Sequence, residues 1–195
     1  MARTFVNSKV AVEEHVFLVK RFFDQQGDKL GEVADILVRA FQSGHRVFFF
    51  GNGGSAADAQ HLAAEFVGRF QHDRPGLPAL ALTTDSSALT AIGNDYGYES
   101  VFARQIEALG QKEDVAVAIS TSGRSPNIRE GILAARNRGL TTIGLLGGDG
   151  GTAKEMVDVA LVVDGRKTAR VQEVHILVGH LLCEAVEAAL FERRP

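Results

Sequence analysis

The chain has 195 residues, of which 45% are hydrophobic and 23% are charged, and its net charge is −3 at pH 7. This composition is typical of a soluble globular protein, and the negative charge argues against a nucleic-acid-binding surface. No apolar run approaches the about 18 residues of a membrane-spanning helix, and the N-terminal segment lacks the pattern of a signal peptide. The single cysteine, Cys183, rules out an intrachain disulfide. We therefore expect a cytoplasmic protein that binds neither nucleic acid nor membrane.

Residues 1–44 are expected to form a helical hairpin. Apolar residues at helical spacing predict one helix over 8–26, the segment 25–28 (QQGD) predicts a break, and a second helix follows as far as Gly44. The apolar surface of this hairpin is large for a chain of this length. The hairpin must bury that surface on the rest of the domain or on a partner chain.

Five short apolar runs after the hairpin predict five buried strands, over 47–50, 78–82, 115–119, 141–146 and 159–163. Helices are expected between them, over 86–92, 99–109, 128–137 and 152–156, and a long helix over 168–191 ends the chain. Apolar strands that alternate with helices indicate a parallel sheet covered on both faces. The predicted fold class is therefore α/β, a doubly wound flavodoxin-like sandwich of five parallel strands with an N-terminal α-hairpin. We expect one domain over 1–195, with the hairpin at 1–44 and the sandwich at 45–195.

The first strand is followed by the glycine-rich turn Gly51–Ser55 and then by a helix. Glycines let the backbone approach a ligand closely, and a helix N-terminus after a strand directs free N–H groups at an anion. The spacing matches neither the Rossmann fingerprint nor the P-loop. A tight turn without any ligand explains the pattern equally well.

His61 and Glu65 lie four residues apart on the helix that follows, and so on one face of it. Such a pair can bind a metal, or act as a base and the group that orients it. A pair of this kind is also common on solvent-exposed helix surfaces, and spacing alone does not separate these readings.

The third strand ends in a second polar turn, Ser120–Ser125 (STSGRS), at the start of the next helix. A phosphate group requires several short hydrogen-bond donors and no carboxylate nearby, and four hydroxyl residues before a helix N-terminus supply them. This turn is the predicted phosphate site, although one or two of its hydroxyls would suffice to cap a helix.

Gln172 and His180 lie eight residues apart on the C-terminal helix, which separates them by about 12 Å along an ideal helix axis. One copy of the helix does not easily bring both side chains to a single metal. A site that uses both therefore suggests a bent helix or side chains from two subunits.

Several stretches together resemble the sugar-isomerase (SIS) domain family and, within it, the phosphoheptose isomerases. The similar segments are FGNGGSAADAQHLAAEFVGRF (50–70), RPGLPALALTTD (74–85), AIGNDYGYESVFARQIEALG (91–110), EDVAVAISTSGRSPNI (113–128), GLLGGDGG (144–151) and TARVQEVHILVGHLLCEAVE (168–187). The resemblance covers nearly the whole chain, and it is the combination of segments that is specific to the family.

The resemblance implies an aldose–ketose isomerase. The family converts sedoheptulose 7-phosphate to D-glycero-D-manno-heptose 7-phosphate through an enediol, for heptose and lipopolysaccharide precursors. It also implies a homotetramer built around the N-terminal hairpins, with active sites at subunit interfaces and one Zn²⁺ per subunit. A base for the carbon-bound proton and an acid for the oxygens suit this chemistry.

The resemblance assigns roles to individual residues of this chain. Glu65 and His180 match the catalytic base and acid, and the metal ligands would be His61, Glu65, Gln172 and His180. The residues that match substrate contacts are Asn52, Gly53, Gly54, Ser55, Glu65, Arg69, Asn94, Asp95, Ser120, Thr121, Ser122, Ser125 and Gln172. A carboxylate held by zinc is a poorer base, so the two roles of Glu65 compete.

Two other functions fit the same resemblance. SIS proteins that bind the replication initiator keep the scaffold but lack the acidic and imidazole groups that Glu65 and His180 supply here, and SIS-domain regulators that sense sugar phosphates carry a DNA-binding module that this chain lacks. One departure from the family pattern is Ala169, where some members carry an aspartate.

Overall fold

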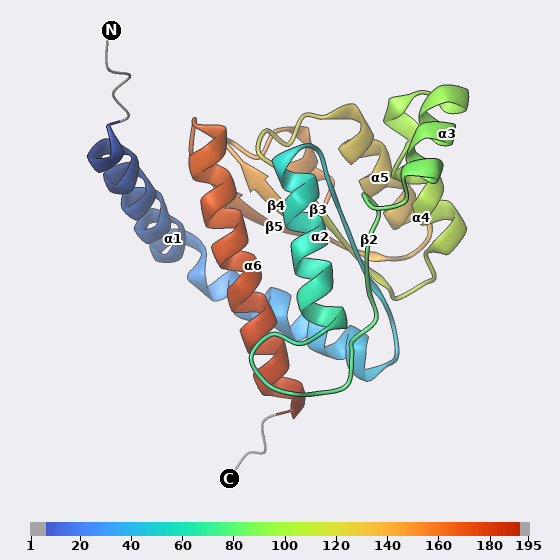
Figure 1. Ribbon diagram of the computed structural model, residues 1–195, viewed down its shortest axis with the longest axis horizontal. Coiled ribbons are helices and arrows are strands. Elements are labelled where there is room, and N and C mark those ends of the chain that lie inside the picture. Colours follow the sequence, from blue (N-terminus) through green and yellow to red (C-terminus); the bar gives the residue numbers. More distant parts are fainter. Residues whose placement is uncertain (1–6, 192–195) are drawn as a thin grey trace, which may run out of the picture.

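The computed structural model describes residues 7–191. The chain forms one five-stranded parallel sheet in the order β2-β1-β3-β4-β5, with helices on both faces (Figure 1). The strands are β1 (Val47–Gly51), β2 (Ala79–Ala81), β3 (Val115–Ser120), β4 (Thr141–Gly147) and β5 (Val159–Val163). The predicted α/β sandwich and all five strands are confirmed, and the order is that of the flavodoxin-like doubly wound sheet.

The sheet separates two hydrophobic cores. On one face, Val47 and Phe49 of β1 pack with α1 (Ser8–Gln42), α2 (Gly54–Val67) and α6 (Thr168–Phe191). On the other face, Phe48 and Phe50 pack with the remaining helices. These are α3 (Ser86–Tyr96), α4 (Ala103–Leu109) and α5 (Pro126–Asn137), together with the short 3₁₀ helices η1 (Tyr98–Ser100) and η2 (Thr152–Glu155). A strand buried on both faces needs apolar residues at every position, which explains the unbroken run of β1.

The predicted N-terminal hairpin is wrong, because α1 is a single helix of 35 residues. One glycine inside a helix costs only about 1 kcal/mol, so Gly27 does not end α1. The helix is held at this point by Gln26, whose side-chain amide donates to the carbonyl of Val162 and accepts from its N–H. These bonds satisfy backbone groups of the edge strand β5, and the ribbon of α1 changes direction along its length (Figure 1).

Smaller differences concern the ends of other helices. The helix predicted over 86–92 continues to Tyr96, and the helix predicted over 99–109 is divided into η1 and α4. The C-terminal helix has the predicted bounds, Thr168–Phe191. By length and composition α6 resembles a membrane-spanning helix, but its buried residues pack into the core against α1, α2 and the sheet.

Candidate active site

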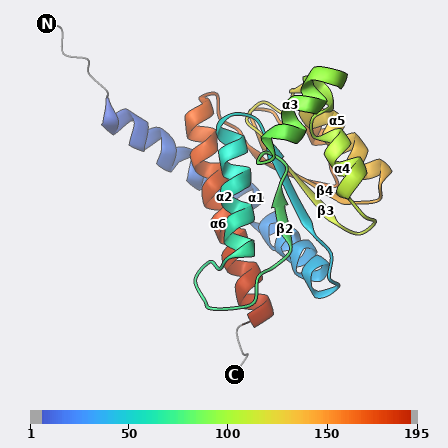
Figure 2. The ribbon, with the colours of Figure 1, turned by 45° about the vertical axis from the view of Figure 1, so that its right-hand side comes forward.

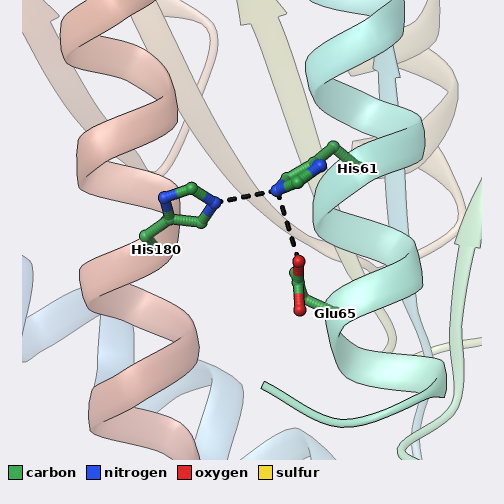
Figure 3. Close-up of side chains that lie close together, drawn as sticks. All are labelled: His61, Glu65 and His180. Atoms are coloured by element: carbon green, nitrogen blue, oxygen red, sulfur yellow. Dashed lines mark hydrogen bonds and ion pairs between the residues drawn. The ribbon is translucent and has the colours of Figure 1, made fainter. Parts of the chain in front are cut away.

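Three polar side chains from two helices meet on the face of the sheet covered by α2 and α6. These helices lie side by side in both views of the ribbon (Figures 1 and 2). His61 and Glu65 point from α2 and His180 points from α6, as Figure 3 shows. The Nε2 atoms of His61 and His180 are 2.8 Å apart, and Oε1 of Glu65 is 3.3 Å from Nε2 of His61. The His61 side chain is about half exposed, so this cluster is open to a ligand.

The close approach of the two helices depends on Gly179, the residue before His180. A Cβ atom at position 179 would lie 2.5 Å from a methyl carbon of Leu62, which is buried beside His61. The absence of a side chain at Gly179 lets Leu62 pack against the backbone of α6. The ring of Phe70 also stacks on the ring of His180, with centroids 5.6 Å apart.

The cluster has the donors of a metal site. One nitrogen from each histidine and one carboxylate oxygen of Glu65 lie within 4.8 Å of one another. Two histidines and one glutamate are a ligand set of catalytic zinc sites, with metal–nitrogen bonds of about 2.0–2.1 Å, so that ligand atoms lie about 3.3 Å apart in a tetrahedron. The observed separations fit this geometry after small side-chain adjustments.

Gln172, the fourth predicted metal ligand, is not part of this cluster. Its side-chain amide lies against Gly54 at the N-terminus of α2, where a Cβ atom on Gly54 would overlap it. Because α2 and α6 run in the same direction, Gln172 faces the start of α2 while His180 faces its middle. Gln172 as the fourth ligand of the set therefore stays a prediction.

The predicted phosphate turn surrounds a small cavity at the carboxyl ends of β1 and β3. The cavity has a volume of about 50 Å³. Its lining residues are Asn52, Ser55, Ile119, Ser120, Thr121, Ser122 and Ser125. Ser125 is the N-cap of α5, yet its side chain makes no capping hydrogen bond, and within residues 7–191 no acidic side chain lines the cavity. The hydroxyls and the positive end of α5 make this cavity suitable for a phosphate group.

The position of the cavity follows from the strand order. In the strand order 2-1-3-4-5, β2 is added on one side of β1, and β3, β4 and β5 are added on the other side. The switch between the two sides lies between β1 and β3, and ligands of such folds bind in the crevice at this point. The last residue pair between β1 and β3 is Gly51 with Ile119, so both polar turns leave the sheet at that crevice. Gly53 is the N-cap of α2 and has φ of +57°, a conformation that favours glycine.

Six predicted substrate contacts lie outside both the cavity and the cluster, namely Gly53, Gly54, Arg69, Asn94, Asp95 and Gln172. Asn94 and Asp95 are exposed in the last turn of α3, where the amide of Asn94 donates to Asp95. This helix packs on the face of the sheet opposite to α6. Arg69 is exposed in the segment after α2, next to Phe70.

Sequence reasoning missed Asp58, which lies one turn before His61 on α2. Burial raises the pKa of the Asp58 carboxyl to about 6, although the nearby His61 acts in the opposite direction. Its Oδ2 is buried without a hydrogen-bond partner among the described residues. The spacing of three residues between Asp58 and His61 was the available signal, because it places both on one helix face.

A buried ion pair that the sequence did not predict fixes the segment after α2. Arg74 Nε donates to Glu187 Oε2 at 2.7 Å, and both side chains are 1% exposed. Glu187 also accepts the backbone N–H groups of Phe70, Gln71 and His72. Burial alone would raise the pKa of Glu187, but these N–H groups and Arg74 lower it to about 2. The pair therefore holds Phe70 beside His180.

Comparison with known proteins identifies the family. The SIS domain model matches residues 12–147. This chain belongs to the SIS-domain family. A phosphoheptose isomerase of Nitratidesulfovibrio vulgaris is 53% identical over 190 residues, covering 95% of this chain and 91% of the relative. A phosphoheptose isomerase of Pelobacter propionicus is 56% identical over 162 residues, covering 83% and 86% of the two chains.

A solved structure similar to this chain is also a phosphoheptose isomerase. The phosphoheptose isomerase GmhA of Neisseria gonorrhoeae superposes with a TM-score of 0.88 at 41% identity, covering 94% of this chain and all of that one. Within the SIS-domain family the chain therefore belongs to the phosphoheptose isomerases, which are aldose–ketose isomerases. The NanR protein of Vibrio vulnificus in complex with ManNAc-6P shares 14% identity with this chain, and that likeness shows the fold alone.

Proposed function

We propose that this protein interconverts sedoheptulose 7-phosphate and D-glycero-D-manno-heptose 7-phosphate and supplies heptose precursors of lipopolysaccharide. The observation that carries the proposal is the placement of two sites along α2. Ser55, near its start, lines the phosphate-sized cavity, and the His61, Glu65 and His180 cluster begins six residues later, about 9 Å along the helix axis. In this substrate the phosphate and the reacting carbons lie at opposite ends of the molecule.

The reaction requires two kinds of proton transfer. In the forward direction, the Glu65 carboxylate removes a proton from C1, which gives the enediol, and the same proton returns at C2. His180 exchanges protons with the oxygens on C1 and C2, so that the carbonyl group moves from C2 to C1. The Ser120–Ser125 turn holds the phosphate and thereby fixes C1 and C2 beside these groups.

We further propose that His61, Glu65 and His180 hold one Zn²⁺ per subunit. When bound, zinc would supply a Lewis acid for the carbonyl oxygen. Gln172 of the same chain lies against Gly54, so its participation would require a second subunit or a rearrangement of α6. Asp58 and Phe70 would fix the orientations of His61 and His180 around such a site.

A homotetramer in the cytoplasm completes the proposal. The first part of α1 extends away from the sandwich (Figure 1), and it exposes Val12 and Phe17, each 60% exposed, together with Val16. A contiguous apolar face of this kind fits an interface with other copies of the chain. Phe17→Glu should reduce the oligomer measured by light scattering, whereas an unchanged tetramer would place the interface elsewhere.

The catalytic roles are tested by Glu65→Gln and His180→Gln in an assay with sedoheptulose 7-phosphate and other ketose phosphates. Each variant should lose turnover by at least about 100-fold, the usual contribution of a general acid or base. The matched controls are Glu184→Gln and His15→Gln, since both residues lie outside the cluster and Glu184 is exposed on the same helix as His180. Wild-type rates in either test variant would contradict the assignment, and no isomerisation by the wild-type protein would favour a binding scaffold or a sugar-phosphate sensor.

A further inference from the structure

The two polar turns of the site are joined by a pair of asparagine side chains. Asn52 follows β1 and Asn127 lies in the first turn of α5, 75 positions later. The amide of Asn52 donates to Oδ1 of Asn127, and the amide of Asn127 donates to Oδ1 of Asn52, both at 2.8 Å. Asn127 is 3% exposed, so water does not compete for these bonds. Each amide therefore fixes the position of the other.

This pair continues the contact between β1 and β3 beyond the end of the sheet. The backbone ladder ends at Gly51 and Ile119, and the chain then diverges into the two turns. Among the described residues, no other hydrogen bond joins residues 52–55 to residues 120–127. The reciprocal amide bonds are thus the polar connection that sets the distance between the turns.

The two turns form opposite walls of the phosphate cavity. Asn52 and Ser55 line one wall, and the Ser120–Ser125 turn lines the other. A cavity needs about 10–15 Å³ to hold one water molecule, so the volume of about 50 Å³ holds a group of a few heavy atoms. In a cavity this small, phosphate binding should depend strongly on the distance between the two turns.

About half of the hydrogen-bonding capacity of the Asn52 side chain is used within the protein. Its Oδ1 accepts from Asn127 and lies 3.5 Å from the hydroxyl of Tyr98, and one of its two N–H groups is used by Asn127. Because Asn127 holds the Asn52 side chain in place, Asn52 is better suited to fixing the turn than to recognising a substrate hydroxyl.

We propose that Asn127 is a positioning residue that acts through Asn52 to hold the two turns at the spacing of a phosphate group. The inference rests on the proposed function, since it assigns the cavity to the substrate phosphate. Neither asparagine touches His61, Glu65 or His180 in the structure, so the pair acts on phosphate binding rather than on proton transfer.

The test compares Asn127→Ala, Asn52→Ala and the double variant, with Asn137→Ala as the control because Asn137 is exposed at the other end of α5. We expect a rise of about tenfold in KM, with kcat within about threefold of wild type, in both single variants. Titration calorimetry with inorganic phosphate should show a similar loss of affinity. Because each variant breaks the same pair, the double variant should be no weaker than the single ones.

Three outcomes would overturn the proposal. These are phosphate affinity within twofold of wild type in Asn127→Ala, effects of the single variants that multiply in the double variant, and a wild-type protein that does not bind phosphate. Asn127→Ser, which keeps one hydrogen-bonding group, should give an intermediate affinity and serves if the alanine variant does not fold. Since calorimetry needs no turnover, a wild-type protein that binds phosphate without isomerising sedoheptulose 7-phosphate would contradict the proposed function and leave this inference standing.

Discussion

His61 and His180 are 119 positions apart in sequence, and their Nε2 atoms face each other at 2.8 Å. At that distance one imidazole must donate a hydrogen bond to the other, and a bound metal would move the two nitrogens to about 3.3 Å apart. Oε1 of Glu65 lies 3.3 Å from Nε2 of His61. The arrangement brings two imidazole nitrogens and one carboxylate oxygen to one point, and its simplest chemical use is to bind a divalent metal.

The first prediction concerns this metal. Protein purified without chelator should contain about one zinc ion per chain, and His61→Ala should reduce the content at least tenfold because one of three ligands is removed. Mass spectrometry of the metal content measures this without any assay of activity. His15→Ala is the control, since His15 pairs with Glu173 away from the cluster. Equal zinc content in both variants would contradict the site.

The second prediction tests how the two histidines are brought together. Gly179→Ala would place a Cβ atom 2.5–2.7 Å from the methyl carbons of the buried Leu62, and α6 would have to move away from α2. We expect lower zinc affinity and a loss of stability of about 1–3 kcal/mol from overpacking.

The control for this variant is Gly27→Ala in α1, where a Cβ atom has nothing within 4 Å. The same substitution should stabilise the protein there by up to about 1 kcal/mol, because alanine is the better helix former. Zinc affinity unchanged in Gly179→Ala would show that helix spacing does not determine the cluster.

The sequence predicted the sheet well because β1, β3 and β4 are buried on both faces, and unbroken apolar runs of that length have few alternatives. It failed at Gly27, where local propensity indicated a break. The bonds from Gln26 to Val162 hold α1 at this point, and their partner lies more than 130 positions away. Tertiary contacts of that kind leave no local signal.

The site shows the same limit. The hydroxyl-rich turn at Ser120–Ser125 was recognisable because all its donors are consecutive in sequence. The Asn52–Asn127 pair was not recognisable, because single asparagines next to turns are common and the pairing depends on the ladder between β1 and β3. Asp58 stands out only once its burial is known.

The third prediction concerns pH. His175 is 1% exposed, and burial lowers its pKa from 6.5 to about 4, although the backbone of Leu146 beside the ring acts in the opposite direction. Between these values the unfolded chain binds a proton that the folded chain does not bind. The stabilisation is complete above pH 6.5 and decreases as the pH falls toward 4, by up to roughly 3 kcal/mol.

The comparison with His175→Leu isolates this effect. Asp58 has a raised pKa and contributes the opposite slope, with stability that is lost as pH rises toward about 6, but it does so in both proteins. Urea unfolding at pH 7.5 and pH 5 should therefore show a smaller loss of stability in the variant than in the wild type. Equal losses would mean that His175 does not titrate in the unfolding reaction.

The last prediction concerns the buried ion pair behind the cluster. Glu187→Ala leaves the guanidinium of Arg74 buried without its carboxylate and removes the acceptor of the N–H groups of residues 70–72. Loss of one partner of a buried pair costs about 3–5 kcal/mol, and the lower free energy of unfolding should appear in urea titrations. Hydrogen exchange at residues 70–72 should accelerate as well, whereas Glu184→Ala, at an exposed position one turn earlier on α6, should change neither quantity. If Glu187→Ala matched Glu184→Ala in both measurements, the segment that carries Arg69 and Phe70 would have to be held by contacts other than this pair.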